Sequence, residues 1–196
     1  MDDSSKAVKA FISDITYDDG SEGSSVPDQV NYYIELIKNN PNIKTVLEIG
    51  FNAGISAAAF LAARADIQVV SLDIGHHFHV LGAKYNIDKH FPGRHSLVIG
   101  DSTKTMPFLR DYFGARPIDL IMIDGWHIRP VPKIDLENCL EWCGPHTFII
   151  VDDVCETYGG MGVNEAVAEV IDTKKVVFLE HKMSGDRGWV LLKKVM

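Results

Sequence analysis

The sequence predicts an α/β fold: a doubly wound, Rossmann-like sheet of seven mostly parallel strands, with an antiparallel last strand and helices on both faces. First, short apolar runs alternate with helical patterns, which implies right-handed crossovers and a parallel sheet buried on both faces. Second, two β-like runs near the end, Lys175–Leu179 and Gly188–Leu192, follow each other without a helix between them. Such runs predict a hairpin, so the last strand should be antiparallel.

The elements can be placed along the chain in order. Residues 1–26 are expected to form an N-terminal segment with one amphipathic helix and a flexible acidic loop at Asp18–Ser25. Residues 27–196 are expected to form a single catalytic domain, whose first helix begins at Pro27 and ends at Asn39-Asn40-Pro41. The predicted parallel strands are Thr45–Glu48, Gln68–Asp73, Ser96–Ile99, Leu120–Ile123 and Thr147–Val151, and the helical patterns include Ile55–Ala63, Ile134–Trp142 and Gly162–Ile171.

The turn after the first strand is the most informative segment. Gly50 and Gly54 let a ligand approach the backbone, and Asn52 tolerates a left-handed conformation. The spacing differs from the G-x-G-x-x-G of dinucleotide sites, and Glu48 would repel a pyrophosphate but suits a ligand with positive charge. The pattern Glu48-x-Gly50-x-x-x-Gly54 resembles the first motif of class I S-adenosylmethionine (SAM)-dependent methyltransferases, which implies SAM as the cofactor.

Composition and charge exclude several classes of function. The chain has 196 residues and a net charge of 19 − 27 = −8, which argues against a nucleic-acid partner. It has neither an apolar run long enough to span a membrane nor a secretory signal, so we expect no membrane partner and a cytoplasmic location. The three cysteines lack a zinc-ribbon spacing and indicate free thiols in a reducing compartment.

Polar residues follow the second and third strands, where ligands bind in open parallel sheets. Asp73 lies 73 − 50 = 23 residues after Gly50, which favours hydrogen bonds to ribose hydroxyls over a helix cap. The segment Gly100-Asp101-Ser102 resembles the adenine-side motif of the same family. Asp101 and Ser102 are therefore expected to contact adenine, and a helix cap at the same place is compatible with that role.

Three carboxylates follow the fourth and fifth strands: Asp124, Asp152 and Asp153. Like charges gathered at one edge are costly unless a cation neutralises them, and oxygen ligands suit Mg²⁺ or another hard divalent cation. Adjacent residues of a strand point to opposite faces, so both Asp152 and Asp153 can ligate only if the chain turns there. From the residues alone, a metal site and a set of loop-capping acids both remain open.

A second resemblance bears on these alternatives. Asp124-Gly125-x-His127, with Asp152-Asp153 after the next strand, resembles metal-dependent O-methyltransferases, especially a small group acting on sugar hydroxyls. The resemblance implies that Asp124, Asp152 and Asp153 hold Mg²⁺ and that His127 is the general base; Asp124 is also expected at the cofactor. The glycines around Met161 suggest a mobile lid over the acceptor.

The sequence therefore predicts a SAM-dependent and metal-dependent O-methyltransferase acting on a sugar or glycan hydroxyl. A catechol-type O-methyltransferase is the alternative within the class. A NAD-dependent oxidoreductase or epimerase and a non-catalytic SAM-fold subunit are alternatives from other classes. A homo-oligomer and a domain of a longer protein are both compatible with the sequence.

Overall fold

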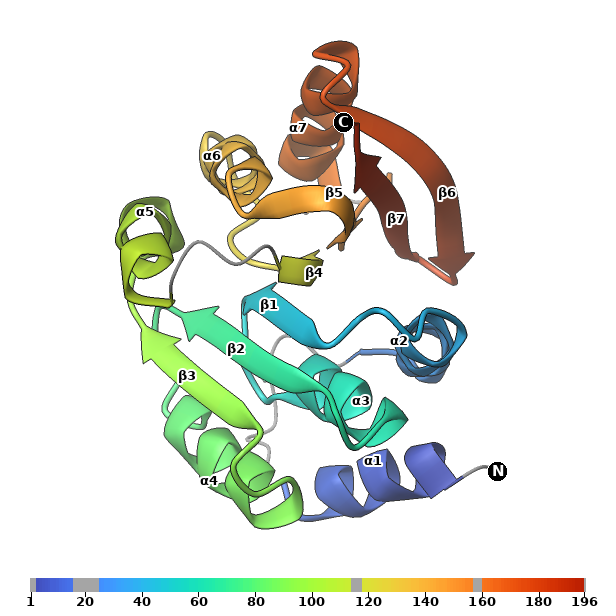
Figure 1. The fold of residues 1–196 in the computed structure, drawn as a ribbon, viewed down its shortest axis with the longest axis vertical. Coiled ribbons are helices and arrows are strands. Elements are labelled where there is room, and N and C mark those ends of the chain that lie inside the picture. Colours follow the sequence, from blue (N-terminus) through green and yellow to red (C-terminus); the bar gives the residue numbers. More distant parts are fainter. Residues whose placement is uncertain (1–2, 16–24, 114–117, 157–159, 196) are drawn as a thin grey trace.

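The computed structural model describes residues 3–15, 25–113, 118–156 and 160–195 (Figure 1). Along the chain, its elements are α1 (Asp3–Ser13), α2 (Pro27–Asn39), β1 (Thr45–Ile49), α3 (Ile55–Ala63), β2 (Gln68–Asp73), α4 (Val80–His90), β3 (His95–Ile99), α5 (Ser102–Phe113), β4 (Ile118–Ile123), α6 (Val131–Leu140), β5 (Cys143–Val151), α7 (Gly160–Asp172), β6 (Val176–Ser184) and β7 (Arg187–Lys194). The acidic loop expected at Asp18–Ser25 falls almost wholly outside the described residues.

The strands form one seven-stranded sheet in the order β3-β2-β1-β4-β5-β7-β6, as Figure 1 shows. Neighbours from β3 to β5 are parallel, whereas β7 is antiparallel to both β5 and β6. The predicted fold class, with its reversed last strand, is confirmed. The two-residue turn at Gly185 and Asp186 reverses the chain, with Gly185 at a φ of 63°.

β5 and β6 extend furthest beyond the ranges that the sequence predicted. β5 begins at Cys143, and β6 continues past Leu179 to Ser184. The prediction stopped at Leu179 because the charged residues Glu180 and Lys182 interrupt the apolar run. β6 is the edge strand of the sheet, where water reaches these charged side chains and pairing with β7 can continue.

Helices cover both faces of the sheet. On one face, α1 to α4 pack with Val46, Val69 and Met122 in one apolar cluster, which includes Val8 and Phe11 of α1. On the other face, α5 to α7 pack with the side chains that alternate with these along the same strands. The amphipathic helix predicted in the N-terminal segment is therefore part of the main core.

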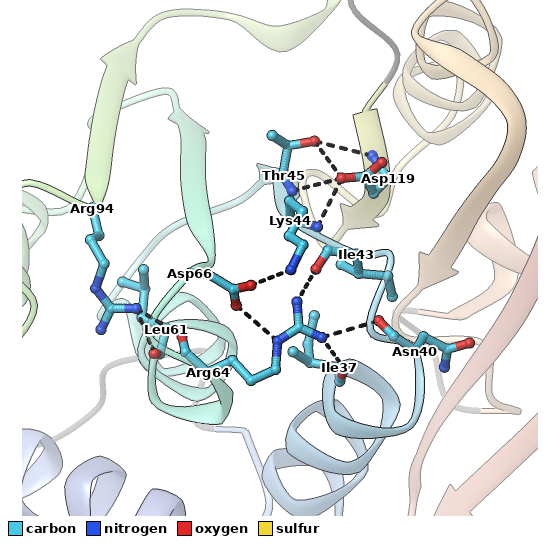
Figure 2. A network of polar contacts seen from close by, with 10 residues as sticks. All are labelled: Ile37, Asn40, Ile43, Lys44, Thr45, Leu61, Arg64, Asp66, Arg94 and Asp119. Atoms are coloured by element: carbon cyan, nitrogen blue, oxygen red, sulfur yellow. Dashed lines mark hydrogen bonds and ion pairs between the residues drawn. The ribbon is translucent and has the colours of Figure 1, made fainter.

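The amino ends of the strands are held by a polar network that lies opposite the predicted site (Figure 2). The Asp119 carboxylate accepts hydrogen bonds from the Lys44 and Thr45 amides at 2.8 and 2.9 Å. Arg64 donates to the carbonyls of Ile37, Asn40 and Ile43 near the end of α2, and it pairs with Asp66 at 2.8 Å. These bonds satisfy backbone groups that the end of a helix leaves open. Among the described residues, no helix is long and apolar enough to cross a membrane.

Candidate active site at the carboxyl ends of the strands

The loop after β1 adopts the left-handed conformations that its sequence predicts. Gly50, Asn52 and Gly54 have φ values of 93°, 45° and 76°. A β-carbon on Gly50 would overlap the Asp124 carbonyl group and lie 2.6 Å from its carbonyl carbon. We expected the glycines to make room for a ligand. The structure shows that Gly50 also makes room for the chain itself, since the loop packs directly against the end of β4.

Glu48 lies beneath this loop and has no surface that a ligand could touch. Its carboxyl group accepts hydrogen bonds from the hydroxyl groups of Ser56 on α3 and Ser71 on β2. Burial raises its pKa to about 8, although both serine hydrogen bonds oppose the shift. The expected direct contact between Glu48 and a cationic ligand is therefore corrected: this side chain joins β1 to β2 and α3 from inside.

Asp73 organises the same loop from the end of β2. One carboxylate oxygen accepts from the Phe51 and Asn52 amides at 3.0 and 2.8 Å, and the other accepts from the Gly75 amide at 2.7 Å. Asp73 is buried, with 8% of its surface exposed. Asp73 therefore does not cap the next helix, which was the alternative considered from the sequence; α4 begins only at Val80. Contact with ribose stays a prediction, since each carboxylate oxygen can accept more than one hydrogen bond.

Asp101 caps α5, as one of the two compatible interpretations predicted. Its carboxylate accepts from the Thr103 amide and hydroxyl at 3.0 and 2.6 Å, and it pairs with Lys104 at 2.8 Å. The hydrogen bonds from Lys104 and Thr103 lower its pKa. Ser102 is the first residue of α5. Contact of Asp101 and Ser102 with adenine stays a prediction.

Asp124, His127 and Asp153 form a cluster at the ends of β4 and β5. Each offers one ligand atom, and these atoms all lie within 4.8 Å of one another. His127 Nε2 lies 2.8 Å from a carboxylate oxygen of Asp153 and 3.8 Å from one of Asp124. Asp153 has a φ of 56°, so the chain turns there and directs this carboxylate toward the end of β4.

Burial and the contacts within the cluster raise the pKa of two of its members and lower the pKa of the third. Hydrogen bonds to Asp124 and Asp153 raise the pKa of His127 to about 10. Desolvation raises the pKa of Asp124. Burial alone would also raise the pKa of Asp153, but contacts with His127 and Arg187 outweigh it and lower that pKa. In this state the imidazolium provides the positive charge that two close carboxylates require.

Asp152 is the one predicted metal ligand that the structure does not bring into this cluster. Its two carboxylate oxygens accept from the Gln29 side-chain amide at 2.7 and 2.6 Å, and one also accepts from the Asp153 amide at 2.9 Å. Gln29 is buried on α2, and nothing in the sequence links it to Asp152, which lies 123 residues away. Sequence reasoning missed Gln29 because only the packing of α2 on the sheet creates the contact.

The two carboxylates of the cluster suit a hard divalent cation, whereas its imidazole is a ligand more typical of transition metals. Two carboxylates and an imidazole converge from neighbouring strands, and Asp124 retains 31% of its side-chain exposure. Carboxylate oxygens are preferred by Mg²⁺, and the cation would take over the charge balance now provided by His127. Asp152 would become a further ligand only by sharing or leaving its contact with Gln29.

The rim of the cluster is apolar and open. Trp126 and Ile128, on either side of His127, are 64% and 56% exposed. Met161 is 61% exposed and lies in the first turn of α7, so the lid expected around it is helical from Gly160 onward. A β-carbon on Gly162 would overlap the His127 carbonyl, so this helix packs tightly against the loop that carries His127.

Comparison with known proteins identifies the family. A family model described as a methyltransferase domain matches residues 47–154, more than half of the chain. The chain belongs to this methyltransferase family. No curated protein sequence matches the methyltransferase closely enough to count as a relative.

Solved structures share the fold of the methyltransferase at low sequence identity. An O-methyltransferase from Bacillus cereus in complex with SAH is 17% identical, with a TM-score of 0.76, and the match covers 99% of this chain and 92% of that one. TomG, an O-methyltransferase of tomaymycin synthesis from Streptomyces achromogenes in complex with SAM, is 19% identical with a TM-score of 0.76, covering 100% and 91%. The predicted class I SAM-dependent methyltransferase is therefore confirmed in family and fold.

Proposed function

We propose that the methyltransferase transfers a methyl group from SAM to a hydroxyl group of a sugar or glycan, with Mg²⁺ or another hard divalent cation at Asp124 and Asp153. The observation that carries this proposal is the packing of Gly50 against Asp124. It puts the glycine loop of the family motif directly beside the acidic cluster. A donor bound at the loop and an acceptor bound at the cluster would therefore be neighbours, which is the main requirement for a direct transfer.

Residues at the loop are suited to hold the donor. SAM supplies a methyl group bonded to a positively charged sulfur. Helix α3 begins at Ile55, so the N–H groups of its first turn have no partner within the helix and point toward the loop. Asp73 and Asp101 carry negative charge at the ends of the next two strands. The SAH and SAM complexes of the Bacillus and Streptomyces proteins support the choice of donor.

Asp124 and Asp153 would hold the cation, and Asp152 is proposed as a third ligand. A divalent cation lowers the pKa of a coordinated hydroxyl group and orients it. Within the chain, Gln29 fixes the Asp152 carboxylate, and Arg187 lies 3.5 Å from Asp153. These contacts restrict where the carboxylates can point, which limits the geometry of whatever they bind.

His127 is the proposed general base. Its Nε2–H faces the Asp153 carboxylate, so the acceptor's proton would go to Nδ1 of the neutral ring. Its contact with Asp153 orients the ring. A cation at the carboxylates would remove the charge balance that now keeps His127 protonated, so the loaded site would contain a neutral imidazole. A neutral histidine is a suitable base near neutral pH.

The acceptor is proposed to carry a second oxygen beside the reacting hydroxyl, as a sugar diol does. A catechol is the second candidate, because the exposed Trp126 and Ile128 offer an apolar rim to a flat ring. Turnover measured with matched sugars and catechols distinguishes the two. Activity confined to catechols would reject the sugar proposal and leave the metal proposal in place.

The central experiment combines calorimetry with an activity assay. We expect Mg²⁺ to bind the wild-type protein in the presence of SAH, and EDTA to abolish turnover until Mg²⁺ is restored. Asp124→Asn should lose Mg²⁺ binding, whereas the matched control Asp186→Asn, in the exposed turn between β6 and β7, should retain it. Full turnover in EDTA would reject the metal site. Binding of NAD in place of SAM would favour an oxidoreductase, and the absence of SAM binding would favour a non-catalytic subunit.

A further inference from the structure

The outer edge of β6 is unpaired within the described part of the chain. β6 is the last strand in the sheet order, and Figure 1 shows it at the rim of the molecule. Its apolar side chains are unusually open to water: Val177, Phe178, Leu179 and Met183 are 45%, 49%, 44% and 51% exposed. The ladder with β7 shifts register between Phe178 and Glu180 and is regular from Glu180 to Ser184, so this last stretch is the part of the edge that can serve as a template for another strand.

The register with β7 determines which backbone groups face this edge. Ser184 pairs with Arg187 across the two-residue turn, and Lys182 and Glu180 follow at two-residue steps. Residues that flank such a turn exchange hydrogen bonds with each other, so these three direct their backbone groups toward β7. The residues between them alternate, so His181 and Met183 present their N–H and C=O groups to the free edge.

The side chains of β6 are complementary to a second copy of the same strand in one register. Within one chain, Lys182 lies 3.0 Å from a carboxylate oxygen of Glu180, whose other oxygen accepts from the Tyr32 hydroxyl at 2.7 Å. In antiparallel pairing centred on His181, Glu180 also stands opposite Lys182 of the second copy, and symmetry repeats the pair, so the four charges alternate in sign. A centre on Glu180 would oppose two carboxylates, and a centre on Lys182 would oppose two ammonium groups. Like charges directly opposite each other destabilise a sheet, whereas opposite charges stabilise it.

We propose that the β6 edge binds a second copy of this chain through two-fold antiparallel pairing centred on His181. The pairing uses the same patch on both subunits, as two-fold interfaces do, and joins two seven-stranded sheets into one. His181 of one chain pairs with His181 of the other. The two residues exchange backbone hydrogen bonds, since their backbone groups point outward from β6. Glu180 and Lys182 then form the closer, non-hydrogen-bonded pairs, in which side chains interact most strongly.

Charge reversal tests the register of this pairing. In sedimentation equilibrium, the wild-type protein should show twice the 21.8 kDa mass of the chain. Lys182→Glu should weaken the dimer about tenfold, because two attractive cross-strand pairs become repulsive. The double variant Glu180→Lys/Lys182→Glu should restore it, since the opposite charges face each other again. Lys9→Glu, an exposed change of the same charge on α1, is the matched control and should leave the dimer unchanged.

A cysteine pair tests the two-fold centre independently of charge. Hydrogen-bonded antiparallel residues have Cα atoms about 5.5 Å apart, which a disulfide can span. His181→Cys should therefore crosslink two chains on oxidation, whereas the control Lys9→Cys should not. A wild-type protein that stays monomeric at every concentration overturns the proposal. A dimer that ignores Lys182→Glu and leaves His181→Cys uncrosslinked overturns it as well.

Discussion

Replacing the buried Glu48 by glutamine should change how the stability of the protein depends on pH. The carboxyl group is shielded from water beneath the glycine loop, and its pKa is raised to about 8 from an ordinary value of 4.5. Between these two values the folded protein binds a proton that the unfolded chain releases. The free energy of unfolding should therefore fall as the pH rises through this interval, and the loss should be complete above about pH 8.

The size of the effect follows from the interval between the two pKa values. Each pH unit within it changes the free energy of unfolding by about 1.4 kcal/mol, so the whole interval corresponds to on the order of 5 kcal/mol. Glu48→Gln removes the ionisable group and keeps an oxygen that can accept from Ser56 or Ser71. Relative to the wild type, the variant should therefore gain about this much stability between about pH 5 and pH 8.

Urea unfolding at a series of pH values measures this difference directly. The comparison cancels the contributions of all other ionisable groups, as well as any constant cost of the amide. Glu35→Gln, on the exposed side of α2, is the control and should leave the pH dependence unchanged. Parallel stability curves for Glu48→Gln and the wild type would refute the reasoning, because Glu48 would then ionise equally in the folded and unfolded chains.

Three further outcomes are expected. His127→Ala should lower turnover by about 10²–10⁴-fold with unchanged SAM affinity by calorimetry, as expected for loss of a general base, and unchanged turnover would remove His127 from the chemistry. Gly50→Ala should cost about 2–5 kcal/mol in urea unfolding, since its φ is 93° and the new β-carbon would overlap Asp124; a stable variant would contradict the close packing of this loop. Arg64→Ala should cost about 2–3 kcal/mol, because the carbonyls near the end of α2 lose their donor, and a loss below 1 kcal/mol would show that water replaces it.

The sequence was sufficient for the fold because the governing patterns are local. Apolar runs separated by helical patterns specify strands and crossovers, and a two-residue turn without a helix specifies the reversed β7. The ends of the strands could also be predicted, since the acids follow directly after the apolar runs. That is why Asp73, Asp101 and Asp124 were all expected at the edge where the structure has them.

The direction of each side chain at that edge depends on contacts across the fold. Glu48 was expected at the ligand, but serines from α3 and β2 enclose it. Asp152 and Asp153 are adjacent in sequence, yet Gln29 of α2 holds the first while His127 holds the second.

The sequence by itself determined which residues reach the carboxyl edge of the sheet, because each acid follows directly after an apolar run and so lies at the carboxyl end of a strand, whatever the order of the strands. Only the tertiary structure decided which of them face one another. A carboxylate turns toward whichever donor or cation neighbouring elements bring within a few ångströms, and those neighbours are far away along the chain.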